Sequence, residues 1–428
     1  MQVELGMDAE QFAGAKAVVR ERLKGLAAEL DRYLATEYAI DPDNKPAFER
    51  WCASHQPFHW FVDFYGIMKN GGFDVIIGNP PYVEYSKVRK DYQVRGFATE
   101  SCGNLYAFCT ERSLDLLTRR GRFGFIVQAP VMSTQRMAPV RGELRRRSDV
   151  VLCASFDDRP SKLFDGMHHS RVAILLSRVG DPAAGATTGT TRYHKWYKTE
   201  REHLFPLLHY LVLNRDYPDA IVPKFTSSAE PRLFEKVLKM PQRVGQLFAF
   251  GEDTPYRIYY KITGVGHWFT FTLKPPRFWR DGVEGTSTRE SSVAFPNKLA
   301  RDTVFCCLWS TLHFWLYQAR TNCRDFNPSD LAFLPIPRSV AAGVAEFRKL
   351  TADIADLLGR TSGVGSGEYS VGGTVAYQRF KPKLAKSLFD EIDRVLAKHY
   401  GFTDEELDFI INYDIKYRMG QEAEECEE

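Results

Sequence analysis

The 428-residue sequence contains no apolar run long enough to cross a bilayer, and we expect no secretory leader. Its eight cysteines include no C-x-x-C pair and no cysteine–histidine spacing typical of metal ligands, so we expect reduced thiols and a cytoplasmic location. The formal net charge is only +3, so any binding to nucleic acid must come from local basic patches. Length and composition predict a globular protein of two or three domains.

The most informative stretch is Asn79-Pro80-Pro81-Tyr82. It follows the apolar run 73–78, whose β-branched residues, bounded by glycine and proline, predict a buried strand. The two prolines fix consecutive φ angles and have no N–H to donate, and the residue before a proline is kept extended. We therefore expect a stiff turn at the carboxyl end of a strand, the edge of an open α/β sheet where ligands bind.

This turn presents chemistry suited to an aromatic amine. The side-chain oxygen of Asn79 and the carbonyl of Pro80 are two acceptors, which match the two hydrogens of an exocyclic amino group. The ring of Tyr82 can stack on the face of the same base. A base inside a duplex cannot reach such a pocket unless it is flipped out of the helix. The alternative interpretation is a proline-stiffened strand end with a surface tyrosine.

Residues 79–82 resemble motif IV of the DNA amino-methyltransferases, most closely the adenine-N6 enzymes of the gamma order. The resemblance implies that Asn79 and Pro80 hold the adenine amino group, with Pro81 completing the motif, and that Tyr82 stacks on the base. Residues 104–106 and 121–130 resemble motifs V and VI, and residues 161–172 resemble motif VIII. By its place in motif VIII, Phe164 would contact the opposite face of the flipped base. Methyl transfer to an amine needs no metal, and we assign no metal site.

Two regions carry candidate DNA-binding residues. The polar stretch 85–101 contains Lys87 and Arg89 and is either a mobile loop beside DNA or an ordinary solvated loop. Between 201 and 345, aromatic and basic residues interleave in short alternating runs, which suits phosphate contact and groove reading. The alternative for this region is an ordinary β-rich domain. The candidates there are Arg257, Lys274, Arg277 and Arg280.

The order of these signals predicts an α/β protein built on a partial Rossmann-like methyltransferase sheet, with an α+β target-recognition domain and helical termini. The expected parts are a helical segment over 1–66, the catalytic part over 67–200, the recognition domain over 201–345 and a helical C-terminal segment over 346–428. Within the last segment, glycine-rich 363–373 is interpreted as a flexible linker, and the acidic tail 421–428 as disordered. Residues 181–191 are interpreted as a loop and 297–320 as one apolar helix.

A methyltransferase of the resembled family uses S-adenosylmethionine, which it binds with a glycine-rich turn after the first strand. No such turn lies upstream of Asn79, and the glycine clusters at 264–266 and 365–367 match only by glycine count. We therefore expect a separate polypeptide to carry the cofactor-binding half, with double-stranded DNA as the substrate. The alternatives are a catalytically silent DNA-binding remnant or specificity subunit of a restriction–modification system, and an RNA or protein methyltransferase with the same pocket chemistry.

Overall fold

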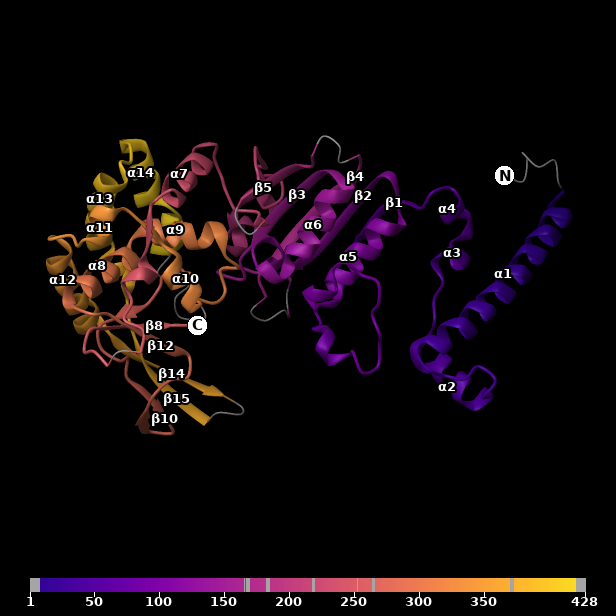
Figure 1. Cartoon of the computed structure of the whole chain (residues 1–428), viewed down its shortest axis with the longest axis horizontal. Helices are drawn as coiled ribbons and strands as arrows, with labels where there is room; N and C mark the ends of the chain where they lie inside the picture. The colour runs from indigo at the N-terminus through magenta and orange to yellow at the C-terminus, as the bar shows by residue number, and fades with distance from the viewer. Residues whose placement is uncertain are drawn as a thin grey trace. The chain divides into compact units, whose positions relative to one another are not determined.

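The computed structural model describes residues 8–164, 166, 170–181, 185–217, 220–251, 253–263, 266–369 and 373–420. The chain divides into two compact units, which we describe separately (Figure 1). Unit 1 comprises 1–125, 143–150 and 176–186, and unit 2 comprises 126–142, 151–175 and 187–428. The predicted acidic tail at 421–428 lies outside the described residues.

Unit 1 begins with four helices, as the sequence predicts for this segment. They are α1 (Ala9–Glu37), α2 (Lys45–His55), α3 (Trp60–Asp63) and α4 (Tyr65–Lys69). Asp8 forms a capping box with Gln11 at the start of α1. A hydrogen bond of 2.7 Å from His59 Nε2 to Asp31 ties the segment before α3 to α1. In the described part of the chain, no helix is both long and apolar enough to cross a membrane.

A six-stranded sheet has the strand order β1-β2-β4-β3-β5-β6. Strand β1 (Phe73–Gly78) runs parallel to β2 (Leu117–Gln128), and α5 (Leu105–Leu116) connects them, which makes a β-α-β unit. The remaining elements of this region are β3 (Ser148–Phe156), β4 (Val172–Val179), β5 (Thr187–His194), β6 (Leu211–Leu213) and α6 (Ala138–Arg147). Because β5 begins at Thr187, the predicted loop over 181–191 extends too far.

The prediction that 73–78 is a buried strand is wrong in one respect. The strand is present, but it stands at the edge of the sheet, and Val75 and Ile77 are 54% and 77% exposed. A continuous apolar run is typical of a strand covered on both faces and both edges. In β1 the sequence has that character, but the described residues supply a neighbouring strand on one side only.

Unit 2 has an aromatic core between helices and a three-stranded sheet. The sheet has the order β12-β8-β9, and Phe269 and Phe271 pack against Phe326 and His313. The predicted single helix over 297–320 is instead two helices, because Ser310 adopts an extended ψ of 146° and caps the second. The elements are β8 (Arg257–Lys261), β9 (Phe271–Thr272), β12 (Glu290–Ala294), α7 (Ala229–Leu238), α8 (Lys298–Trp309), α9 (Thr311–Arg320) and α10 (Pro328–Phe333).

The C-terminal part of unit 2 is helical, as predicted, with α13 (Lys386–Tyr400) followed by α14 (Asp404–Asn412), which has a capping box at Thr403. The prediction that 363–373 is a flexible linker is wrong. Residues Gly363–Tyr369 form β14 and Gly373–Arg379 form β15, two antiparallel strands of a sheet with the order β11-β10-β15-β14. Other elements are β7 (Gln242–Arg243), β10 (Phe278–Arg280), β11 (Val283–Gly285), β13 (Pro335–Ile336), α11 (Arg338–Ala341), α12 (Phe347–Thr361) and α15 (Ile415–Met419).

Candidate functional site

The stretch Asn79–Tyr82 lies directly after the carboxyl end of β1, as predicted. Asn79 and Pro81 are exposed, whereas Pro80 is buried. Within the described residues, the Asn79 side chain has no hydrogen-bond partner, so its amide oxygen is available to a ligand. The exposed amide oxygen of Asn79 is therefore an acceptor on a backbone that the buried Pro80 fixes.

The phenol of Tyr82 is half-buried beside α5. Its ring makes an edge-to-face contact with the ring of Tyr106, with centroids 6.3 Å apart. Burial raises the pKa of the Tyr82 hydroxyl to about 12, so the ring is neutral at physiological pH. A neutral ring held by a second aromatic residue is suited to stacking on a planar ligand.

The segment that follows Tyr82 forms a closed loop. Glu84 and Asn104 form an isolated antiparallel bridge, and the Tyr85 N–H donates to the Gly103 carbonyl at 2.9 Å. The Leu105 N–H donates to the carbonyl of Val83, also at 2.9 Å. These bonds join the start of α5 to the residues next to Tyr82. The loop is therefore fixed at its base, directly beside the candidate site.

Glu111 anchors this loop, a role that no pattern in the sequence indicated. It lies on α5 and is buried. Its carboxylate accepts from the N–H groups of Ala98 and Thr99 at 3.0 and 2.9 Å and from the Thr99 hydroxyl at 2.8 Å. A carboxylate that satisfies three donors fixes the backbone of the loop. No local sequence signal distinguishes it from an exposed helical glutamate.

Phe164, the second predicted stacking residue, belongs to unit 2. It is half-buried between β3 and β4, and the residues before it are anchored by Arg201, which donates to the carbonyl of Leu163 at 2.9 Å. Asp157 directly follows β3 and Arg171 directly precedes β4, and the Arg171 guanidinium donates to the Asp157 carboxylate at 3.1 Å. Burial raises the pKa of Asp157, but the charges of Arg171 and Lys195 more than offset this and hold it below its usual value. The structure describes Tyr82 and Phe164 in separate units, so the role of Phe164 stays a prediction.

The predicted DNA-binding residues fall into two groups. Lys87 and Arg89 are exposed on the loop of unit 1, and Lys274 and Arg280 are exposed in unit 2; none of these four forms an ion pair with another described residue. The other two already have partners. Arg257 donates to the Ser292 hydroxyl at 3.0 Å, and Arg277 donates to Glu284 at 3.0 Å while its guanidinium lies 4.6 Å from the Trp279 ring.

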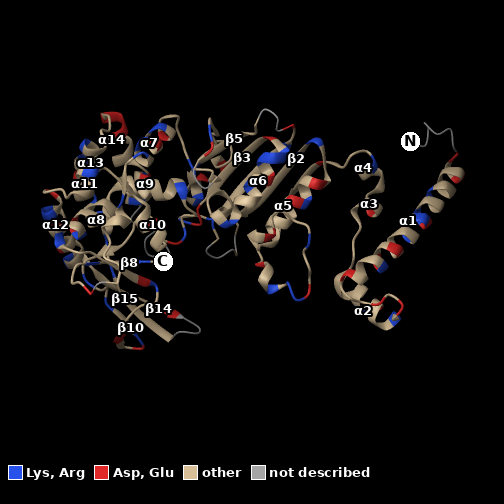
Figure 2. Ribbon diagram, viewed as in Figure 1, with Lys and Arg blue, Asp and Glu red and all other residues tan. Residues whose placement is uncertain are grey.

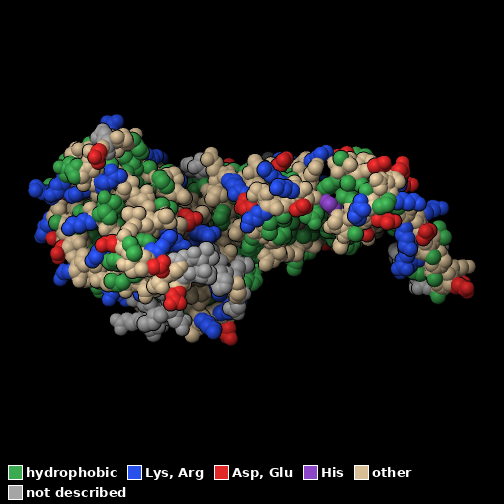
Figure 3. Space-filling model, turned by 90° about the horizontal axis from the view of Figure 1, so that it is seen from below, with side chains coloured by type: hydrophobic (Ala, Val, Ile, Leu, Met, Phe, Trp, Pro, Cys, Tyr) green, Lys and Arg blue, Asp and Glu red, His purple; other side chains and the backbone are tan. Residues whose placement is uncertain are grey.

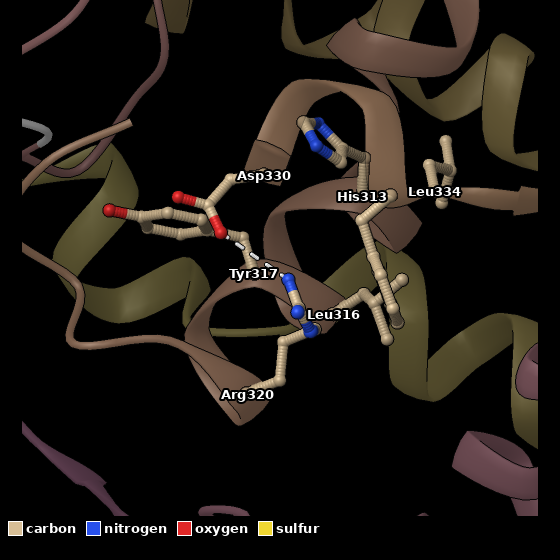
Figure 4. A pocket seen from close by; sticks show the side chains of 7 residues that line it. His313, Leu316, Tyr317, Arg320, Asp330 and Leu334 are labelled. Carbon is tan, nitrogen blue, oxygen red and sulfur yellow. Dashed lines mark hydrogen bonds and ion pairs between the residues drawn. The ribbon is translucent and has the colours of Figure 1, made fainter. Parts of the chain in front are cut away.

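A small pocket in unit 2 lies between α9 and α10 (Figure 4). Arg320 pairs across it with Asp330 at 3.3 Å, and its guanidinium lies over the Phe333 ring. Burial lowers the pKa of His313 to about 4, so this imidazole is neutral. The Tyr317 hydroxyl donates to the Asp325 carbonyl at 2.9 Å, and His313 Nδ1 lies 3.0 Å from the Leu308 carbonyl. We assign this pocket a packing role.

None of the described glycine clusters has the form of a cofactor turn. Gly365 and Gly367 lie within strand β14 rather than after a strand. Gly72 precedes β1, and a Cβ there would lie 2.3 Å from the Leu116 carbonyl, so this glycine is required for close packing. The cluster at 264–266 lies mostly outside the described residues. The glycines that the structure describes in these clusters therefore do not form a turn after a strand.

Apolar side chains are concentrated on the surface of the first 80 residues. Among the residues that the structure describes, 23 large hydrophobic side chains are exposed, and twelve of them lie between Val18 and Ile77. Figure 2 shows acidic and basic residues along α1, and Figure 3 shows apolar side chains among the charged ones. Such an apolar surface, together with an open strand edge, is typical of an interaction site. Two of these exposed residues, Val75 and Ile77, lie on β1, and six closely precede it in the sequence, namely Phe58, Trp60, Phe61, Phe64, Tyr65 and Ile67.

We expect the isolated chain to self-associate through the open edge of β1. Ile77→Lys should reduce this association, because a charged residue on an edge strand opposes pairing with another strand. Val212→Lys on β6, the opposite edge of the same sheet, is the matched control, since Val212 is also exposed, at 51% against 77% for Ile77. Light scattering across a concentration series measures the effect. Equal association of both variants and wild type would show that the β1 edge is not the contact.

The sequence comparisons bear on the same region. Residues 23–160 match the Eco57I restriction-modification methylase family. The match includes β1, the Asn79–Tyr82 turn, the loop and α5. A protein of Methanocaldococcus jannaschii, named as a type II restriction enzyme and methyltransferase, is 36% identical over 136 residues, which are 32% of this chain and 11% of that protein. The type II methyltransferase M.PaeR7I of Pseudomonas aeruginosa is 26% identical over 241 residues, covering 54% of this chain and 37% of that one.

These matches support a relationship to restriction–modification methyltransferases. The matched part of the chain spans 11% of the length of the Methanocaldococcus protein and 37% of the length of M.PaeR7I. Among solved structures, the Type IIL restriction-modification enzyme MmeI in complex with DNA has a TM-score of 0.42 at 9% identity, covering 82% of this chain and 59% of that one. The Type ISP enzyme LlaBIII bound to DNA has a TM-score of 0.34 at 10% identity. The alignment covers 79% of this chain and 36% of that one. These structural scores are too low to support an argument about function.

Proposed function

We propose that the chain is the target-adenine pocket and DNA-recognition part of a site-specific adenine-N6 DNA methyltransferase. The observation that carries the proposal is the exposed Asn79 amide at the carboxyl end of β1, on a proline-fixed turn with Tyr82 beside it, within the region that matches the methylase family. In this proposal, the Asn79 oxygen and the Pro80 carbonyl accept hydrogen bonds from the amino group of a flipped adenine. Tyr82 and Phe164 stack on the base, and the residues of 201–345 contact DNA.

The chemistry required of this chain is positioning. Two acceptors on the amino group draw it away from conjugation with the ring and direct its lone pair toward an electrophile. The methyl group comes from S-adenosylmethionine. Because the glycine clusters that the structure describes do not form a turn after a strand, we propose that another polypeptide segment carries the site for this cofactor. The apolar surface around the open edge of β1 supports this part of the proposal.

Calorimetric titration with S-adenosylmethionine tests whether the cofactor site lies outside this chain. The purified chain is expected to show no micromolar binding, while fluorescence anisotropy with a duplex DNA detects binding. Clear micromolar binding of the cofactor would contradict the proposal of a separate cofactor-binding half. Absence of DNA binding would contradict the proposal that residues 201–345 contact DNA, and with it the site specificity of the proposed enzyme.

The second candidate function is a catalytically silent DNA-binding subunit. It is favoured by the observation that no described residue forms a cofactor turn. Substitution of Asn79 distinguishes the two candidates. It should abolish methyl transfer if the pocket takes part in the reaction, and it should have no such effect if the chain is catalytically silent.

A further inference from the structure

The sheet β11-β10-β15-β14 joins two segments that are far apart in the sequence. Strand β10 pairs antiparallel with β15, with Phe278 opposite Tyr377 and Arg280 opposite Val375. The Gln378 N–H donates to the Arg277 carbonyl at 2.8 Å, across a separation of 101 residues. All these residues belong to unit 2. The β14–β15 hairpin, outside the predicted recognition region 201–345, thus shares a sheet with its basic strand β10.

The antiparallel pairing brings two basic segments together. Lys274 and Arg277 precede β10, whereas Arg379 ends β15 and Lys381 follows it. Because the start of β10 lies beside the end of β15, these residues meet at one end of the sheet. Lys274, Arg379 and Lys381 are exposed, and none of them forms an ion pair with any residue in the described ranges. Positive charge from both segments is therefore available to a ligand.

The charges on the strands also differ between the two faces. Alternation along the paired strands places Arg280, Tyr377 and Arg379 on one face. The two carboxylates of these strands, Glu284 and Glu368, lie on the other face, where Glu284 pairs with Arg277. The basic face also presents Gly363, Gly365 and Gly367 of β14, so little side-chain bulk covers that strand.

No described side chain of these four strands is fully buried. The Tyr377 ring lies against Gly365, where a Cβ would come within 2.9 Å of it. A small sheet without a buried face gains stability when another surface covers it. This face carries two arginines, the aromatic residues Phe278 and Tyr377, and no carboxylate of the described strand residues. It is therefore complementary to a polyanion.

We propose that the β14–β15 hairpin is a second DNA-contacting element, in which Arg379 and Lys381 bind the phosphates of duplex DNA beside Lys274 and Arg280. This inference rests on the DNA binding of the proposed function. Contacts of this kind fix the register of a protein on the duplex without reading its sequence. The hairpin thus extends the DNA-binding surface beyond the predicted recognition region.

The test uses the full chain and a fluorescein-labelled duplex of random sequence, with binding measured by anisotropy at several salt concentrations. The hairpin variant is Arg379→Gln with Lys381→Gln, and the recognition-region variant is Lys274→Gln with Arg280→Gln. The control is Arg348→Gln with Lys349→Gln. Both residues are exposed cations on α12, so this variant loses the same charge as the other two. Each phosphate contact contributes about 0.9 to the salt slope, so the hairpin variant should lower the slope by about 2.

A hairpin variant with several-fold weaker binding and a lower slope, beside a control that matches wild type, supports the proposal. Wild-type binding by the hairpin variant, with weakened binding by Lys274→Gln/Arg280→Gln, overturns it and leaves the proposed function intact. An equal loss in the hairpin variant and the control also overturns it, because overall charge would then explain the effect. If the wild-type chain binds no duplex, the DNA-binding part of the proposed function fails as well. Circular dichroism verifies that each variant is folded.

Discussion

Asn79→Ala is expected to abolish methyl transfer in the assembly that performs it, while the affinity for DNA stays nearly unchanged. The side chain is exposed and has no hydrogen-bond partner among the described residues, so its loss removes an acceptor without disturbing a packed contact. Removal of one preorganised polar group from an active site typically costs a factor of about 10²–10³ in rate. Transfer of tritium from labelled S-adenosylmethionine to duplex DNA measures the rate, and anisotropy measures the affinity.

Asn79→Asp is the matched control for this experiment. A carboxylate has nearly the same shape as the amide and still accepts hydrogen bonds, so we expect it to retain part of the activity that alanine loses. If Asn79→Ala is fully active, the pocket assignment is wrong. If the aspartate and alanine variants are equally inactive, the amide contributes something other than an acceptor.

Glu111→Ala is expected to lower the free energy of unfolding by about 3 kcal/mol, the upper range for a charged hydrogen-bonding group whose loss leaves buried donors unsatisfied. The Thr99 N–H and hydroxyl would lose their shared acceptor, and both lie at a fully buried residue. Urea denaturation measures the change. Hydrogen exchange at Ala98 and Thr99 should also accelerate, because their N–H groups donate to this carboxylate.

Asp115→Ala on the same helix is the control for Glu111→Ala. Its carboxylate is part-exposed and pairs with Arg112 at 3.5 Å and with Arg147. A partly exposed ion pair of this kind contributes up to about 1 kcal/mol. If both variants lose the same stability, the loop is not anchored through Glu111. If methyl transfer also falls only in Glu111→Ala, the loop supports the pocket beside it.

The sequence by itself determined the features that depend on neighbouring residues. The apolar run 73–78 forms a strand, and the prolines after it fix the turn that presents Asn79, because their sterics act within one or two residues. Asn104 caps α5 and Thr403 caps α14 for the same local reason. The chemistry proposed for residues 79–82 also came from the sequence, and it stays a prediction; residues 23–160, which include this turn, match the methylase family.

The tertiary structure decided which of these elements are covered and which segments become neighbours. Strand β1 is apolar enough for an interior position, yet it stands at the sheet edge, because its exposure depends on which strand lies next to it. Glu111 has the sequence context of a surface residue, and only the folding back of the loop buries it. The glycine-rich segment 363–373 contributes to two strands because its hairpin pairs with β10, 101 residues away in the sequence. Pairings over such distances depend on the whole chain, and composition within a short window does not encode them.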